Sequence, residues 1–152
     1  MPVDDKRLTV VNIHHDELVI IASAGHPLSK IAQAGIAEVT PFPLLLPKVG
    51  RTRDRLENLF HEHQLKPKIS MELDSSELLK RFVAANVGVG FIARSNVIED
   101  VKAGALAAIT LADASIRRDL ALVFRKDKAL SRAALAFIEV AVKIKQPESA
   151  RI

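Results

Sequence analysis

The sequence predicts an α/β domain in which helices cover both faces of a twisted sheet. Over residues 18–111, short apolar runs alternate with segments of helical periodicity, an order typical of such domains. The most diagnostic segment is 74–93, where a helix with a capped start leads directly into an apolar strand. The five expected strands are 18–22, 44–46, 69–73, 89–92 and 107–111.

Segment 74–93 contains a start signal, an apolar helix face and a sharp turn. Asp74 and Glu77 have the spacing of a capping box, which opens a helix. The apolar residues that follow recur on one face: Leu78, Leu79, Phe82 and Val83. Asn86 tolerates a left-handed helix end, and Gly88 lets the chain turn into strand 89–92.

The part of the chain before residue 48 is expected to supply strands and one short helix. Residues 1–7 should form a mobile leader, and strand Leu8–Ile13 should end at His14, His15 and Asp16. The Gly25-His26-Pro27 segment breaks strand 18–22, because a proline disfavours helix at the preceding residue. A short helix is expected over Ser29–Ala34.

The remaining elements follow from the same patterns. A helix should run from Arg53 to about Gln64, with Leu56, Leu59 and Phe60 facing inward. A further helix is expected over 95–103, and a further strand over 120–124. The last helix should start at Ser131, and the tail from Pro147 should be loose.

Composition excludes several classes of protein. The chain is 49% hydrophobic and 26% charged, and it contains no cysteine, which fits a soluble domain in a reducing cytoplasm. Its apolar runs are too short to span a membrane, and the N-terminus lacks a signal-peptide core. The net charge of +4 comes from interspersed acids and bases, and the absence of Trp and Tyr argues against a stacking platform for nucleic acid.

The sequence offers no pattern that supports catalysis, a metal or a cofactor. The histidines are not spaced to converge on a metal ion. Ser75, Ser76, Ser95 and Ser131 lie at or beside helix starts, where capping explains them. Gly88 and Gly90 resemble the start of a dinucleotide fingerprint, but they precede a strand and no third glycine follows.

The strongest candidate for a binding site is the loop that joins strand 44–46 to the next helix. The first amides of a helix lack partners, so a glycine loop at this place can hold an anion or a polar small molecule. Arg51 can form a bidentate pair with a carboxylate. The alternative is that Gly50 and Thr52 only turn and cap the chain, and that the basic run is a solvated helix start. The expected site residues are Pro47, Val49, Gly50, Arg51, Thr52 and, on a later strand, Phe91; the basic run is Lys48, Arg51, Arg53 and Arg55.

Segment 80–93, Lys-Arg-Phe-Val-Ala-Ala-Asn-Val-Gly-Val-Gly-Phe-Ile-Ala, resembles the effector-binding domain of LysR-type bacterial transcriptional regulators. Asn86 and Ala93 depart from the usual glycine and proline of that segment. Further matches occur in the same order along the chain, so that the resemblance covers residues 8 to 144: 16–21, 25–28, 43–46, 118–127 and 130–131.

The resemblance implies a five-stranded mixed sheet that forms one lobe of a type II periplasmic-binding-protein-like fold. Residues 17–112 would be the second effector-binding lobe, and residues 1–16 and 113–152 a truncated remnant of the first lobe with the C-terminal helix. The function implied is co-inducer sensing, with a small anionic metabolite such as an organic acid held in a cleft between the lobes. The loop 47–52 faces that cleft in the family.

The resemblance also sets the expected partners. DNA would be contacted only through an N-terminal helix-turn-helix domain that this chain lacks. The remnant strands 8–13 and 120–124 would expose apolar side chains and a free edge, so a homodimer with an interface unlike that of the family is expected. No membrane partner is expected. The alternatives are a stand-alone small-molecule-binding protein of the periplasmic type and a small α/β enzyme.

Overall fold

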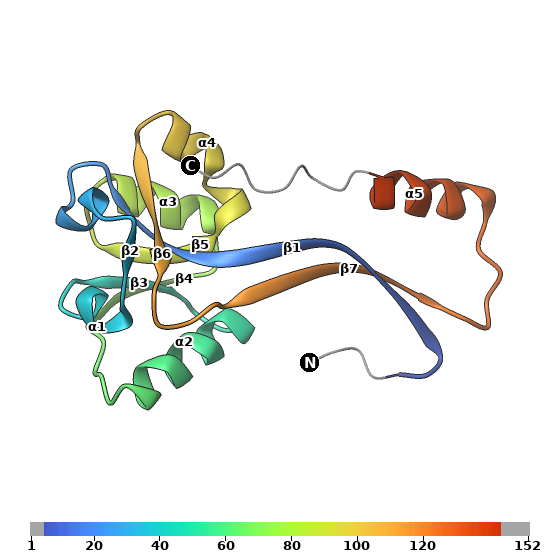
Figure 1. Ribbon diagram of the computed structural model, residues 1–152, viewed down its shortest axis with the longest axis horizontal. Coiled ribbons are helices and arrows are strands. Elements are labelled where there is room, and N and C mark those ends of the chain that lie inside the picture. Colours follow the sequence, from blue (N-terminus) through green and yellow to red (C-terminus); the bar gives the residue numbers. More distant parts are fainter. Residues whose placement is uncertain (1–4, 144–152) are drawn as a thin grey trace. The chain divides into compact units, whose positions relative to one another are not determined.

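The computed structural model describes residues 5–143, which form two compact units (Figure 1). Unit 1 contains residues 5–16 and 118–143, and unit 2 contains residues 17–117. The sequence predicts that unit 2 ends between residues 112 and 113, whereas in the structure it ends between residues 117 and 118. Residues 1–4 of the expected leader and the whole expected loose tail lie outside the described residues.

Unit 2 is built on a mixed sheet, which confirms the predicted fold class. Its strands follow the spatial order β2-β6-β1-β5-β3-β4. β1 is antiparallel to β5 and β6, whereas β3 is parallel to β4 and β5, and β2 is parallel to β6. The strands are β1 (Leu8–Ser23), of which residues 17–23 belong to this unit, β2 (Gln33–Ala34), β3 (Leu44–Pro47), β4 (Ile69–Leu73), β5 (Val89–Ala93) and β6 (Leu106–Leu111). The five predicted strands are all present, and the short β2 is added to them.

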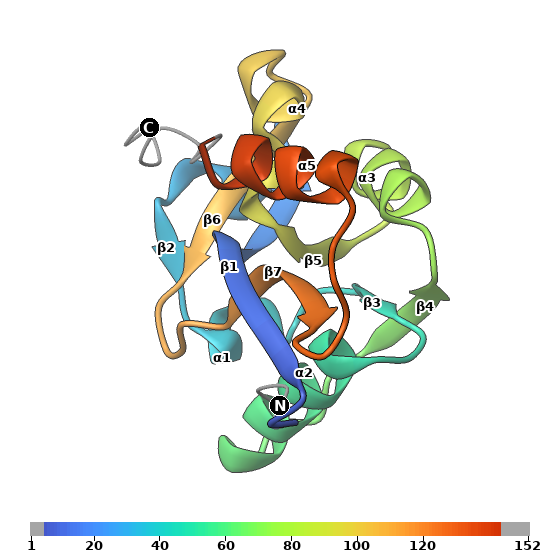
Figure 2. The same cartoon turned by 90° about the vertical axis from the view of Figure 1, so that its right-hand side faces the viewer.

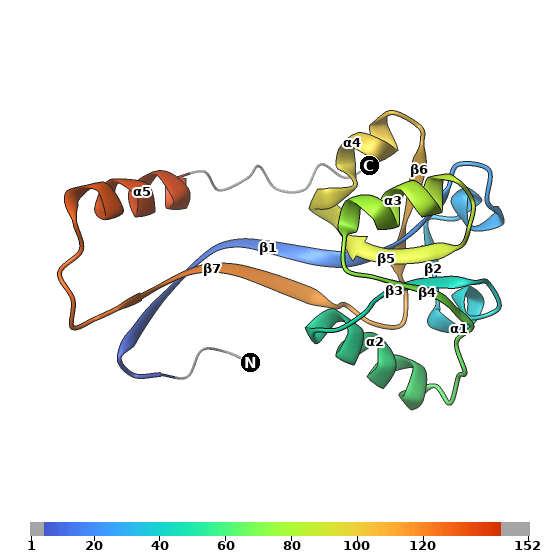
Figure 3. The same ribbon diagram turned by 180° about the vertical axis from the view of Figure 1, so that it is seen from behind.

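Helices pack on both faces of this sheet. α1 (Ile36–Val39) and α2 (Arg51–Glu62) lie on one face, while α3 (Ser76–Ala84) and α4 (Ile98–Lys102) lie on the other (Figure 1). A quarter turn keeps α2 and α3 on opposite sides of the strands (Figure 2), and the view from behind shows β3, β4 and β5 between these two helices (Figure 3).

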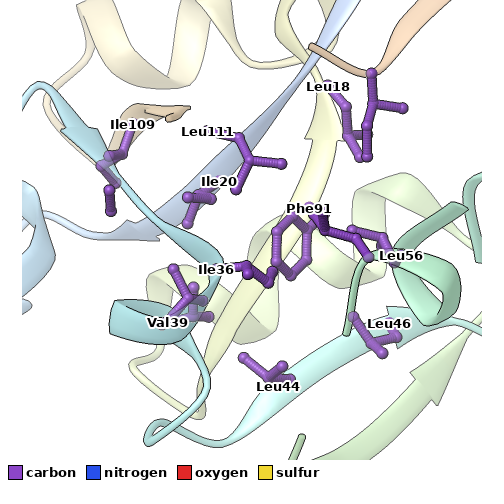
Figure 4. Close-up of a cluster of buried hydrophobic side chains, with 14 of the residues drawn as sticks. Leu18, Ile20, Ile36, Val39, Leu44, Leu46, Leu56, Phe91, Ile109 and Leu111 are labelled. Atoms are coloured by element: carbon purple, nitrogen blue, oxygen red, sulfur yellow. The ribbon is translucent and has the colours of Figure 1, made fainter. Parts of the chain in front are cut away.

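Each face of the sheet has its own hydrophobic core. The core under α1 and α2 contains Phe91, which points among leucines and isoleucines of β1, β3, β6, α1 and α2 (Figure 4). The core under α3 and α4 contains Leu79 and Val83 of α3 together with Val97. Alternate residues of β1 enter the two cores, since Leu18 and Ile20 face one and Val19 and Ile21 face the other.

Two predicted elements near the N-terminus are wrong. β1 is one continuous strand through His14–Asp16, because these polar residues lie where β1 pairs with β7 and where a sheet face need not be apolar. The helix predicted over Ser29–Ala34 is a 3₁₀ helix over Pro27–Lys30, which His26 caps through its ring nitrogen. The chain then forms β2, whose backbone pairs with β6 and so leaves no residues for a longer helix.

Three helix starts also differ from the prediction. α2 begins at Arg51, two residues before the expected Arg53. The cap of α3 is Ser75, whose Oγ accepts a hydrogen bond from the amide of Leu78, whereas Asp74 and Glu77 were expected to form a capping box. The helix predicted over 95–103 is divided into a 3₁₀ turn, Arg94–Asn96, and α4. The predicted left-handed turn is confirmed, because Asn86 has φ 59°.

Unit 1 consists of the first half of β1, most of β7 (Arg117–Arg125) and α5 (Arg132–Lys143). β7 pairs with β1. Within the unit, the amide of Lys126 donates to the carbonyl of Arg7 at 2.8 Å. A 2.7 Å hydrogen bond joins His15 Nδ1 to Asp119 Oδ1. Ser131 accepts from the amide of Ala134 at the start of α5, which confirms its predicted capping role.

No helix between residues 5 and 143 combines the length and the apolar character that crossing a membrane requires.

Buried His26 makes the stability of unit 2 depend on pH. The residue is 8% exposed, its ring packs edge-on against Phe42, and burial lowers its pKa below the ordinary value of 6.5. Because the fold favours the neutral ring, the contribution of His26 to the free energy of unfolding is fully present above the unfolded pKa of about 6.5, and it is lost as the pH falls through the lowered pKa of the folded state.

The expected result is a lower urea midpoint at pH 5.5 than at pH 7.5. In His26→Asn the amide oxygen can replace the ring nitrogen as the acceptor for Leu28, and nothing titrates at this position. The pH difference should therefore shrink in the variant, while the other histidines are shared by both proteins. An equal pH difference in both would show that His26 is not its source.

Candidate functional site

The candidate site lies at one edge of the sheet of unit 2. Since β3 is parallel to both β4 and β5, the carboxyl ends of these three strands meet at the same edge. Ligands of α/β domains collect at this kind of edge, where loops lead from strands to helix starts. The predicted binding loop, residues 47–52, comprises Pro47 at the end of β3, the connecting residues 48–50 and the first two residues of α2, Arg51 and Thr52.

The backbone of this loop presents the start of α2 to solvent. Gly50 is the residue before the helix and has φ 104°, a conformation that favours glycine. It provides no side-chain cap for α2, and its carbonyl accepts the amide of Asp54 at 3.0 Å. The amides of Thr52 and Arg53 also belong to the first turn of α2, where backbone amides find no acceptor within the helix and where the positive end of the helix dipole lies.

The predicted site residues fall into two groups. Pro47, Val49, Gly50, Arg51 and Thr52 are brought together by the loop, and Val49 is 74% exposed. Phe91 is not part of this surface, because its ring is 2% exposed and lies in the core under α2 (Figure 4). Phe91 and Leu56 of α2 belong to the same hydrophobic core, so Phe91 helps to hold the helix that follows the loop.

Arg53 fixes the shape of the loop. Its guanidinium donates to the carbonyl of Pro47 at 3.2 Å, to Glu57 at 2.6 Å and to Glu72 of β4 at 2.7 Å. The side chain is only 12% exposed. The hydrogen bond to Glu57 raises the pKa of Arg53 most, burial opposes this effect, and Glu72 raises it further. Arg53 therefore ties the end of β3 to α2 and β4.

The basic run thus contains residues with different roles. Arg55 donates to the carbonyl of Arg117 at 2.6 Å and joins α2 to the start of β7. Lys48 is exposed on the connection between β3 and α2, and Arg51 is exposed as the first residue of α2. The basic run is therefore not solvated throughout, because the side chain of Arg53 is largely buried. Arg51 is exposed, as a residue that binds an anion from solvent must be.

Arg94 is a second arginine at this edge, and the sequence did not single it out. It follows β5, the neighbour of β3 in the sheet, and it donates to Thr110 of β6 at 3.0 Å. Its guanidinium lies 3.7 Å from a carboxylate oxygen of Glu17. One arginine after a strand carries no motif, and its partners are distant in sequence, so only the fold brings them together.

Other features of the described residues do not form a comparable site. Within residues 5–143, no group of three or more His, Asp or Glu side chains is arranged to hold a metal ion. A shallow, open depression of about 630 Å³ lies at the far end of α2 from the loop, beside His61, Glu62, Gln64, Leu65 and Lys66.

Comparison with known protein families gives one clear match. The sequence model described as LysR substrate binding domain matches residues 1–144. The HTH-type transcriptional activator CmpR of Synechocystis sp. is 29% identical over 85% of this chain and 44% of its own length. The HTH-type transcriptional regulator CbbR of Sinorhizobium medicae is 33% identical over 79% of this chain and 39% of its own length. The chain therefore spans less than half the length of these relatives.

Solved structures show the same fold at low sequence identity. The regulatory domain of CcmR from Synechocystis PCC6803, solved in complex with 2-PG, has a TM-score of 0.80 and 22% identity over 96% of this chain and 71% of that one. The effector-binding domain of QuiR, solved in complex with shikimate, has a TM-score of 0.74 and 17% identity over 94% of this chain and 68% of that one.

Proposed function

Because the chain belongs to the LysR substrate binding domain family, we propose that it is the ligand-sensing domain of a LysR-type transcriptional regulator. The relatives CmpR and CbbR are both named as transcriptional regulators, which favours this role over an enzyme or a stand-alone binding protein. In the whole regulator, DNA contact would belong to a separate helix-turn-helix domain, and the site of action would be the cytoplasm.

The ligand that we propose is a small anionic metabolite, such as an organic acid. The observation that carries this proposal is the uncapped start of α2 beside exposed Arg51. Helix-start amides and an arginine together suit a carboxylate or a phosphate. The shikimate bound to QuiR, a structural neighbour, is a carboxylate. The proposed contacts are Pro47, Val49, Gly50, Arg51 and Thr52, with Phe91 supporting them from the core.

Replacing Arg51 with alanine should weaken binding of the anion by about 1–3 kcal/mol, the range for a lost hydrogen bond to a charged group. The measurement is calorimetric titration with a panel of small organic acids that includes shikimate. Arg81→Ala is the matched control, because Arg81 is an exposed arginine on α3, across the sheet from α2. Equal affinity in Arg51→Ala and the unmodified chain, or a response to no acid, would count against the loop.

We also propose that the chain forms a homo-oligomer. Unit 1 exposes large apolar side chains on all of its elements, and such surfaces favour association. These residues are Val10 of β1, Leu120 and Val123 of β7, and Leu135, Phe137, Val140 and Val142 of α5.

Light scattering at micromolar concentration should therefore give a mass at least twice the 16.6 kDa of the chain. Phe137→Ser and Val140→Ser together should lower that mass, because they remove apolar surface from α5 without touching the buried cores of unit 2. A 16.6 kDa species for the unmodified chain at every concentration would contradict self-association.

A further inference from the structure

A polar cluster around Arg94 lies at the same edge of the sheet as the proposed binding loop, over β5, β1 and β6. It contains Glu17 of β1, Arg94 after β5, Thr110 of β6 and Ser115, all of which belong to unit 2. β5 lies between β1 and β3 in the sheet, and neighbouring strands are about 4.8 Å apart. Pro47 ends β3 and Arg94 follows β5, and because these neighbouring strands are parallel, both residues lie at one edge of the sheet.

The two partners of Arg94 hold it differently. Its Nη2 donates to the hydroxyl of Thr110 at 3.0 Å, an ordinary hydrogen-bond length. The nearest oxygen of Glu17 is 3.7 Å away, which is an ion pair without a hydrogen bond. The other carboxylate oxygen of Glu17 accepts from the hydroxyl of Ser115 at 3.4 Å. Thr110 therefore positions the guanidinium, and Glu17 only neutralises its charge.

The chemistry of the two groups makes Glu17 exchangeable. A guanidinium presents five N–H donors in a planar fork that matches a carboxylate or a phosphate in a bidentate pair. The side chains of Arg94 and Glu17 are 34% and 37% exposed, so solvent weakens their attraction and an external anion can reach the arginine. A bidentate anion would form shorter contacts than the present 3.7 Å.

We propose that Arg94 is a second anion-binding residue of the sensor and that Glu17 is its exchangeable counter-ion. A carboxylate or phosphate group of the ligand takes the place of Glu17 at the guanidinium, while the hydrogen bond to Thr110 keeps Arg94 in position. This inference rests on the proposed ligand-sensing function and names a second contact at the same edge of the sheet. Glu17 competes with the ligand, and its charge limits the affinity.

The test uses the whole chain with two probes, inorganic phosphate and succinate, titrated by calorimetry at constant ionic strength. Arg94→Gln should weaken binding about tenfold or more, since it removes a charge-assisted pair. Glu17→Gln should tighten binding roughly two- to fivefold, because it removes an exposed competing charge. In the double variant the gain should vanish, and affinity should equal that of Arg94→Gln.

Glu99→Gln is the matched control, because Glu99 is an exposed carboxylate on α4 that pairs with Lys102. It should leave affinity unchanged. Circular dichroism checks that Arg94→Gln is folded. If that variant is not folded, Glu17→Gln alone still decides the question, since a merely structural ion pair would give weaker or unchanged binding when its acid is removed.

The outcomes separate this inference from the proposed function. Loss of affinity in Arg51→Ala with unchanged affinity in Arg94→Gln and Glu17→Gln would overturn the inference and leave the loop as the site. The expected changes in the Arg94 and Glu17 variants with no effect of Arg51→Ala would support the inference and overturn the role of the loop. No binding of either probe by the unmodified chain would contradict both.

Discussion

Phe91→Ala should lower the free energy of unfolding by about 3–5 kcal/mol, the cost of emptying a buried aromatic site. The ring is 2% exposed and lies among Leu18, Ile36 and Leu56, which come from β1, α1 and α2 (Figure 4). Three elements therefore lose packing contacts at once. Because stability is typically about 5–15 kcal/mol, the variant should be close to unfolding.

Urea unfolding followed by circular dichroism measures this effect. Leu78→Ala on α3 is the control, since Leu78 is 49% exposed and its removal should change stability by about 0.5 kcal/mol or less. A small loss of stability in Phe91→Ala, combined with a large loss of ligand affinity, would contradict this expectation. Phe91 would then contact the ligand instead of filling the core.

Gly88→Ala should destabilise unit 2 by about 1–3 kcal/mol, in the range of overpacked core substitutions. A methyl group at Gly88 would lie 2.4 Å from the carbonyl oxygen of Pro43. That oxygen also accepts the amide of Val89 at 2.9 Å, where β5 begins beside β3. Backbone must therefore shift to admit the methyl group, and the pairing of the two strands is weakened.

Gly25→Ala is the matched control, because no atom lies within 4 Å of the position that its methyl group would take. Its urea midpoint should equal that of the unmodified chain or exceed it slightly, since alanine restricts the unfolded chain. Equal midpoints for Gly88→Ala and Gly25→Ala would mean that the turn before β5 can relax without cost.

The sequence predicted the elements whose signals are local. Strand 44–46 is a run of leucines, and all three are fully buried in β3. The positive φ of Asn86 was expected from its place after an apolar helix. The continuous β1 and the short β2 could not be predicted, because both depend on pairing with strands distant in the sequence, β7 and β6. Local polarity at His14–Asp16 indicated a strand end instead.

The candidate site was predictable to the same extent. A strand, a glycine loop and a helix start are contiguous, so the loop 47–52 could be selected from the sequence. The role of Arg53 could not, since Glu72 lies 19 positions away and comes close only through the parallel pairing of β3 and β4. Arg94 and Glu17 are separated by most of unit 2, and the antiparallel pairing of β1 with β5 brings them together.

The binding of an anion at the start of α2 is tested most directly by recording amide chemical shifts during titration with shikimate and succinate. The amides of Gly50, Arg51 and Thr52 should shift most, because they lie at the helix start where the anion is proposed to bind. Saturation should follow the calorimetric affinity. Shifts confined to the far end of α2, at His61–Lys66, or no shift in the loop at saturating acid, would contradict the proposed sensor site.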